Sequence, residues 1–144
     1  MNKNSLDWII DTLSGLEYQI TGGLAANLYG SGRDVYDIDI EVSNVDVDRM
    51  GELCRDYIIW GPDRFIDENF DLYLMTLEYG GQLIDICGID GMYIKGRLQV
   101  VDLSKSVLID GLRVVGLSDL IEYKRLLGRE VDLIDIGVIG ERGI

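Results

Sequence analysis

The sequence predicts an α+β (mixed α/β) fold in which helices cover a small mixed sheet. Segments whose apolar residues recur at helical spacing are interspersed with segments that alternate strictly between apolar and polar residues. Glycine falls mostly between these segments, where it marks turns. No linker, repeat or low-complexity tract interrupts the 144 residues. We therefore expect a single domain over 1–144, with its core at about 16–90 and a C-terminal hairpin and helices at 98–144.

The first half of the chain is expected to alternate helices with strands. Leu6, Ile9 and Leu13 recur at helical spacing, and Ser5 or the asparagine before it can cap the start of this segment. An Ala- and Leu-rich stretch after two glycines predicts a short helix, and strict alternation predicts the strand that follows. The expected elements are a helix over 5–16, a strand over 17–21, a helix over 24–29, a strand over 36–42 and a helix over 46–57.

The second half is expected to contain two hairpins followed by two helices. Alternating segments flank Tyr79-Gly80-Gly81, and a shorter pair flanks Asp110-Gly111. Two such segments joined by a glycine turn predict an antiparallel hairpin. Ser118 can cap the helix that follows. The expected elements are strands over 72–78, 82–89, 107–109 and 112–115, and helices from 118 to about 127 and over 129–139.

The composition excludes several classes of chemistry. Without histidine the chain can form neither a Ser-His-Asp triad nor a His-ligated zinc site. Cys54 and Cys87 lack the close pairing of zinc and redox motifs, which favours a reduced, cytoplasmic setting. A net charge of −13 opposes bulk binding to nucleic acid. The chain has no run of ~18 apolar residues and no signal-peptide core, so no membrane association is expected.

Two consecutive glycines, Gly22 and Gly23, join an expected strand directly to an expected helix. Glycine lets backbone approach a ligand closely because it has no Cβ. The first turn of a helix adds free N–H groups and a positive dipole end, so this turn can bind phosphate. The alternative is a tight turn with no ligand.

A cluster of carboxylates is predicted on the following strands. Asp37 and Asp39 are two residues apart in a strand, so their side chains share one face. Asp85 joins them if its strand is a neighbour, and three such carboxylates can hold two metal ions ~3.5–4 Å apart for phosphoryl transfer. Hard oxygen ligands suit Mg²⁺ or Mn²⁺. The alternative is a solvated acidic face, since the Ile-Asp dipeptide recurs elsewhere in the chain.

The order of these motifs resembles the nucleotidyltransferase superfamily with the DNA polymerase beta-like fold. The resemblance covers roughly 16–87 and rests on Gly22-Gly23, Asp37-Ile38-Asp39-Ile40 and Asp85. In size the chain is similar to the minimal nucleotidyltransferases and to small antibiotic nucleotidyltransferases of the lincosamide type.

The resemblance implies a role for each motif. Gly22 and Gly23 would cradle the triphosphate of a nucleoside triphosphate. Asp37 and Asp39 would bind Mg²⁺ or Mn²⁺, and Asp85 would bind the second ion and help to activate the attacking hydroxyl. The second glycine is often serine in this family, so here the backbone N–H of Gly23 would have to serve without a hydroxyl.

Arg33 precedes the acidic strand and resembles an arginine of the family at that position. It could contact phosphate, or it could pair with Asp34 or Asp37.

Lys124 lies in a C-terminal segment similar to the ending of small members of the superfamily. It could reach a γ-phosphate, or it could pair with Glu122 or Asp132 at short helical separation.

The expected function is transfer of a nucleoside monophosphate to a hydroxyl of a protein or small-molecule acceptor, with release of pyrophosphate. A protein acceptor would be a partner toxin and a small one an antibiotic, and a homodimer could complete the cleft. The alternative is a non-catalytic antitoxin or binding module that keeps the fold. A third interpretation is an acidic α+β domain without a site.

Overall fold

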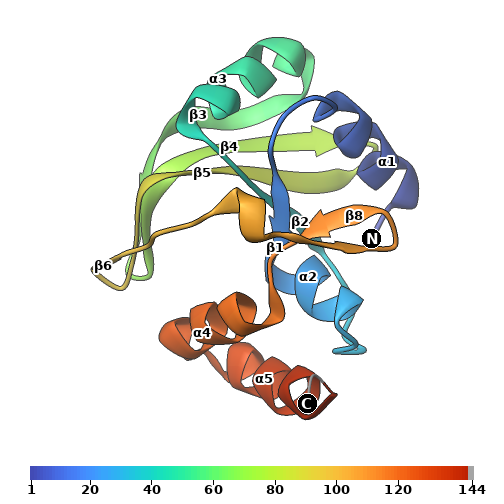
Figure 1. The fold of residues 1–144 in the computed structure, drawn as a ribbon. Helices are drawn as coiled ribbons and strands as arrows, with labels where there is room; N and C mark the ends of the chain where they lie inside the picture. Colours follow the sequence, from blue (N-terminus) through green and yellow to red (C-terminus); the bar gives the residue numbers. More distant parts are fainter. Residues whose placement is uncertain (143–144) are drawn as a thin grey trace.

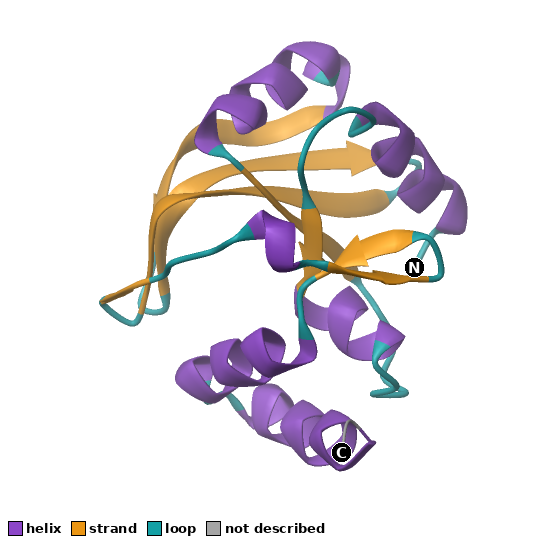
Figure 2. Cartoon of the chain, in the orientation of Figure 1, coloured by secondary structure: helices purple, strands orange, loops and turns teal. Residues whose placement is uncertain are grey.

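Eight strands form one mixed sheet in the computed structural model, which describes residues 1–142 (Figures 1 and 2). Residues 143–144, the end of the expected domain, lie outside the described residues. The strands are β1 (Gln19–Thr21), β2 (Asp37–Val42), β3 (Ile58–Ile66), β4 (Phe70–Tyr79), β5 (Gln82–Ile94), β6 (Arg97–Leu98), β7 (Val107–Ile109) and β8 (Leu112–Val114). Their order is β3-β4-β5-β2-β1-β8-β7, and β6 pairs with β5. The central pair β2 and β5 is parallel, whereas β1 runs antiparallel to β2.

Helices lie on both sides of this sheet. Figure 1 shows α1 (Lys3–Thr12) and α3 (Asn44–Leu53) on one side, and α4 (Leu117–Leu127) packed against α5 (Glu130–Arg142) on the other. The short α2 (Gly22–Leu28) follows β1 directly and contacts β1, β2 and α4. The predicted α+β class, with a mixed sheet and five helices, is confirmed over the described residues. None of these helices is long and apolar enough to cross a bilayer.

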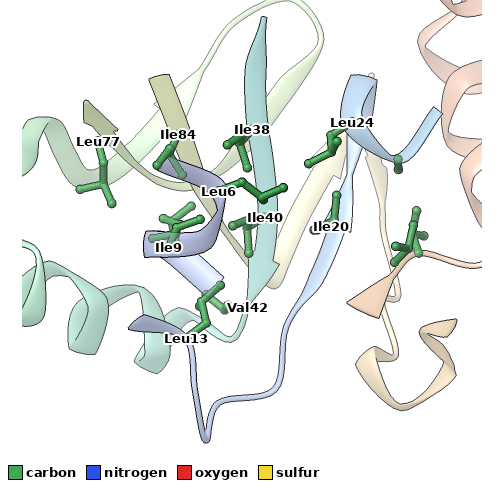
Figure 3. Close-up of a cluster of buried hydrophobic side chains, with 14 of the residues drawn as sticks. Leu6, Ile9, Leu13, Ile20, Leu24, Ile38, Ile40, Val42, Leu77 and Ile84 are labelled. Carbon is green, nitrogen blue, oxygen red and sulfur yellow. The ribbon is translucent and has the colours of Figure 1, made fainter. Parts of the chain in front are cut away.

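The core forms on one face of the central strands. Ile38 lies opposite Ile84 and Ile40 opposite Ile86, and all four side chains are fully buried. Figure 3 shows Ile38, Ile40 and Ile84 gathered with side chains of α1. Burying each isoleucine contributes about 1.5–3 kcal/mol, and a shift of one residue would expose the whole row, so this burial determines the register. The alternating residues of β2 and β5 must therefore face the other side of the sheet.

The start of α1 differs from the expectation. Asn2 caps the helix, and its side chain accepts hydrogen bonds from the N–H groups of Asn4 and Ser5. Ser5 is fully buried, and its hydroxyl donates to the carbonyl of Tyr79 at 2.7 Å. Ser5 therefore joins α1 to the turn after β4 and does not cap the helix.

Two other boundaries were predicted incorrectly. Gly116 precedes α4 without a side-chain cap, so Ser118 lies inside the first turn of that helix. The helix α3 ends at Leu53, and Arg55–Tyr57 is a separate 3₁₀ turn, where the sequence predicted one helix over 46–57.

Strand β3 was not expected from the sequence. It contains Gly61 and Pro62, which normally interrupt a strand, and it lacks regular alternation. Proline is tolerated at the edge of a sheet because no neighbouring strand needs its N–H, and β3 is an edge strand with irregular pairing next to Gly61. β5 extends to Ile94, beyond its expected end at 89, and so supports β4 and β6.

Candidate functional site

A polar row crosses the sheet on the face opposite the isoleucine core. Thr21 lies opposite Asp39 in β2, Asp39 opposite Asp85 in β5, and Asp85 opposite Thr76 in β4. The Thr76 hydroxyl donates to Oδ1 of Asp85 at 2.7 Å. The strand of Asp85 is thus the immediate neighbour of the strand that carries Asp37 and Asp39. From the sequence alone, Asp85 joined the other two aspartates only if their strands were neighbours.

The seven predicted site residues gather around one cavity of about 420 Å³. They come from the β1–α2 turn, the loop before β2, strands β2 and β5, and helix α4. The residues are Gly22, Gly23, Arg33, Asp37, Asp39, Asp85 and Lys124.

The carboxyl groups in this cavity repel one another strongly. The pKa of Asp39 is raised to about 7, first by burial, then by the charges of Asp85 and Asp37, and further by a hydrogen bond with the Asp85 carboxyl. Burial also raises the pKa of Asp85, although the hydrogen bond from Thr76 acts in the opposite direction. A cation placed between these groups would relieve the repulsion.

The donor set fits a hard divalent ion in its chemistry. Three carboxylates from two adjacent strands are the kind of ligands that Mg²⁺ and Mn²⁺ prefer. Within the described part of the chain, however, no three Asp, Glu, Cys or His side chains are already close enough to form a metal cluster. The acids would have to converge further around an ion.

The two glycines of the β1–α2 turn differ in their surroundings. Gly22 has φ +65°, and a Cβ at this position would lie 2.3 Å from Oδ2 of Asp39. Only glycine therefore fits beside this carboxyl group. Gly23 has no positive φ, and a Cβ there would meet no atom within 4 Å.

Arg33 makes a different ion pair from the ones considered from sequence. Its Nε and Nη2 atoms donate to the two carboxylate oxygens of Asp135 in α5, at 2.9 and 2.6 Å. The alternative pairing with Asp34 or Asp37 is wrong. The loop before β2 lies against α5, and local spacing in the sequence does not encode this proximity.

Lys124 is 2% exposed and lies between two acids of α5. Its Nζ is 2.9 Å from Oδ2 of Asp135 and 3.4 Å from Oδ1 of Asp132. Asp132 is therefore a partner, as the sequence offered, but the pair is buried and joins two helices, so it is not a pair at short helical separation. Arg129 also binds Asp132, at 2.7 Å. Three cations therefore surround two buried carboxylates at the wall of the cavity.

Asp135 joins the loop of Arg33 to both C-terminal helices. Burial alone would raise the pKa of Asp135, but hydrogen bonds from Arg33 and Lys124 outweigh burial and lower the pKa. Its charge therefore stabilises the fold above the ordinary pKa of an aspartate, and that stabilisation is lost as the pH falls through the lowered value.

Asp135→Asn should lower the free energy of unfolding by about 2–4 kcal/mol, because it leaves the buried ammonium of Lys124 incompletely paired. Urea unfolding at neutral pH measures this loss. Asp71→Asn is the matched control, because Asp71 pairs with Arg64 at 2.7 Å on the surface, where solvent screens the interaction. Equal losses in the two variants would contradict the structural importance of the buried network.

Glu41 is a residue of this face that the sequence interpretation missed. It follows Asp39 by two positions, so the same alternation that aligns the two aspartates extends to it. Glu41 is 5% exposed, and Nε2 of Gln19 donates to its Oε1 at 2.8 Å. Burial raises the pKa of Glu41, the bond from Gln19 opposes this, and the charge of Asp119 raises the pKa further.

The backbone is similar to a crystal structure from Thermotoga maritima that is described as a "putative nucleotidyltransferase (TM1012)". The TM-score is 0.70 at 19% sequence identity, over 92% of this chain and 91% of that chain. The fold is nucleotidyltransferase-like. This similarity confirms the fold that the motifs resembled, and at this identity it concerns the fold alone.

Other comparisons add little to this result. The structure of JHP933 from Helicobacter pylori matches with a TM-score of 0.47 at 18% identity, over 85% of this chain and 53% of that chain. No protein-family model matches the sequence, and no curated protein does.

Proposed function

We propose that this nucleotidyltransferase-like chain acts as one domain that transfers a nucleoside monophosphate from a nucleoside triphosphate to a hydroxyl of an acceptor. The observation that carries the proposal is that Asp39 fills the space where a Cβ of residue 22 would lie. Asp39 also lies directly opposite Asp85 in the same cavity. A glycine that leaves room for a carboxylate pair suits a site where phosphate and metal ions meet.

The three aspartates Asp37, Asp39 and Asp85 would hold Mg²⁺ or Mn²⁺. The ions would neutralise the phosphates and stabilise charge on the attacking and leaving oxygens. Gly23 leaves open space at the start of α2, where a triphosphate can approach the backbone. Arg33 and Lys124 also line the cavity, where each forms an ion pair with Asp135.

The reaction exchanges the phosphoanhydride bond between the α- and β-phosphates for a phosphoester bond to the acceptor. The acceptor oxygen forms a bond to the α-phosphorus as the bond to the bridging oxygen breaks, and pyrophosphate leaves with the electron pair. The hydroxyl proton passes to a carboxylate of the site or to solvent, and Asp85, which keeps one oxygen bound to Thr76, is the proposed group that assists this step.

Incubation with α-labelled ATP, GTP, CTP and UTP, each with Mg²⁺ or Mn²⁺ and candidate acceptors, tests the proposal. We expect label to move to an acceptor and the transfer to be lost in the Asp37→Ala, Asp39→Ala double variant. Glu52→Gln, an exposed change on α3 outside the cavity, is the control for an unrelated loss of acid charge. Transfer that survives the double variant would eliminate the assigned site.

A non-catalytic antitoxin or binding module is the second candidate. It is favoured by the ion pairs of Arg33 and Lys124, because Asp135 already pairs with both of these cations, which a phosphate would otherwise bind. Tight binding of a partner protein without uptake of Mg-nucleotide in calorimetry would support this module. Binding of Mg-nucleotide that depends on Asp39 would support the enzyme.

A further inference from the structure

A second cavity of about 700 Å³ adjoins the candidate site. Its floor is formed by β1 and β2, and its walls by the segment 97–102 and helix α4. Thr21, Glu41, Met92 and Tyr123 line both cavities, so the two spaces are contiguous. A molecule that fills the larger cavity can therefore extend a hydroxyl toward Asp39.

Glu41 provides a buried carboxylate at the floor of this second cavity. Gln19 occupies its Oε1, while its Oε2 accepts no hydrogen bond from any residue that the structure describes. No lysine or arginine among those residues forms an ion pair with Glu41, although buried charges are normally paired. Among the described residues, every side-chain nitrogen or oxygen that is fully enclosed has a hydrogen-bond partner. Because Oε2 of Glu41 has none, it is not fully enclosed, and it opens onto the cavity that Glu41 lines.

The rim of the cavity adds to this negative charge. Asp102, Asp119 and Glu122 are exposed at the rim, against two exposed arginines, Arg97 and Arg125. Counting Glu41, the lining has four acids and two bases. The charge of the lining therefore complements a cation and opposes an anion.

We propose that this second cavity binds the acceptor, and that the acceptor is a small molecule carrying a cationic amine beside its hydroxyl. The inference rests on the proposed nucleotidyl transfer. The amine stays protonated and is held by Glu41 and the rim acids, while the hydroxyl oxygen is the nucleophile. The volume is within the range of about 300–1,000 Å³ typical of small-molecule sites, and a protein acceptor that inserts one side chain would leave most of it unfilled.

Backbone amide chemical shifts, followed during titration with small probes, test the binding step directly. The cationic probes are glucosamine and 1,3-diamino-2-propanol, and the neutral ones are N-acetylglucosamine and glycerol. We expect the cationic probes to shift the amides of Gln19, Glu41 and Glu122, and the neutral probes to leave them unchanged. Equal effects of both kinds of probe, or no effect of either, would overturn the proposal.

Two sets of variants locate the binding. Asp119→Asn with Glu122→Gln changes only exposed side chains, so folding should survive, and Glu41→Gln tests the floor. Each should weaken binding of the cationic probes at least about tenfold, whereas Glu52→Gln on α3 should not. Unchanged affinity in the rim double variant would refute the assignment even if Glu41→Gln fails to fold.

The outcomes also separate this inference from the proposed function. If Mg-ATP binds and label moves only to a protein, nucleotidyl transfer stands and the small cationic acceptor is refuted. If amines bind at the second cavity but Mg-nucleotide does not bind at the first, the cavity binds cations as inferred and the proposed enzyme fails.

Discussion

Asp39→Asn should abolish nucleotidyl transfer and at the same time stabilise the metal-free protein. The transfer rate is expected to fall at least about 10³-fold, because the variant loses a central ligand of the metal ions. These ions would stabilise the charge that develops in the transition state by several kcal/mol. A residue that served only the fold would affect activity and stability in the same direction. Opposite effects therefore distinguish a functional carboxylate from a structural one.

The gain in stability follows from the raised pKa of Asp39. Its value of about 7 lies above the ordinary 3.8, so the folded state binds this proton more tightly than the unfolded chain does. The free energy of unfolding therefore falls as the pH rises between those two values. At about 1.4 kcal/mol per pKa unit, burial of the Asp39 charge and its repulsion by the other acids together cost a few kcal/mol at most above pH 7. Asparagine carries no charge and removes this cost.

Urea unfolding with a chelator, from about pH 5 to about pH 8, measures the effect. The wild type should lose stability over this interval, and Asp39→Asn should lose less and be more stable by about 1–2 kcal/mol at the upper end. Glu52→Gln, which removes an exposed acid from α3, should keep the wild-type slope. A variant that is inactive and also destabilised at pH 8 would indicate a structural role for Asp39.

Gly22→Ala should destabilise the protein by about 2 kcal/mol or more, because a Cβ at a positive φ is strained and this one would meet Oδ2 of Asp39 at 2.3 Å. The Asp39 carboxyl would have to move away from position 22 and out of its place in the site, so transfer activity should fall as well. Thermal or urea unfolding and the labelled-nucleotide assay measure the two effects.

Gly23→Ala is the matched control for this substitution. Its Cβ meets open space and its backbone is ordinary for the start of a helix. Alanine in α2 should then stabilise by up to about 0.5–1 kcal/mol, because it restricts the unfolded chain and favours the helix. Equal losses in the two variants would mean that the approach of Gly22 to Asp39 is not what requires glycine.

Part of the candidate site could be predicted because it depends on short-range pattern. The period of two along a strand places Asp37 and Asp39 on one face while Ile38 and Ile40 enter the core. That same pattern extends to Glu41, which lies beyond the motif Asp37-Ile38-Asp39-Ile40. Strand β3 was missed because Gly61 and Pro62 break the local pattern, which an edge strand tolerates.

The pairing of Arg33 and Lys124 with Asp135 could not be predicted. Arg33 and Asp135 are 102 residues apart, and they meet only because α4 and α5 fold back against the loop before β2. Similarly, sequence gives no reason to separate Gly22 from Gly23, because the difference arises from the position of Asp39 on the neighbouring strand.

The sequence by itself determined the fold class, the hairpins, the amphipathic helices and the shared face of the first two aspartates, because each depends on residues a few positions apart. The tertiary structure alone decided that Asp85 lies opposite Asp39, that Asp135 binds Arg33 and Lys124, and that a second acidic cavity adjoins the first. These features arise where distant segments pack together, and packing brings charges into contact that no local spacing records.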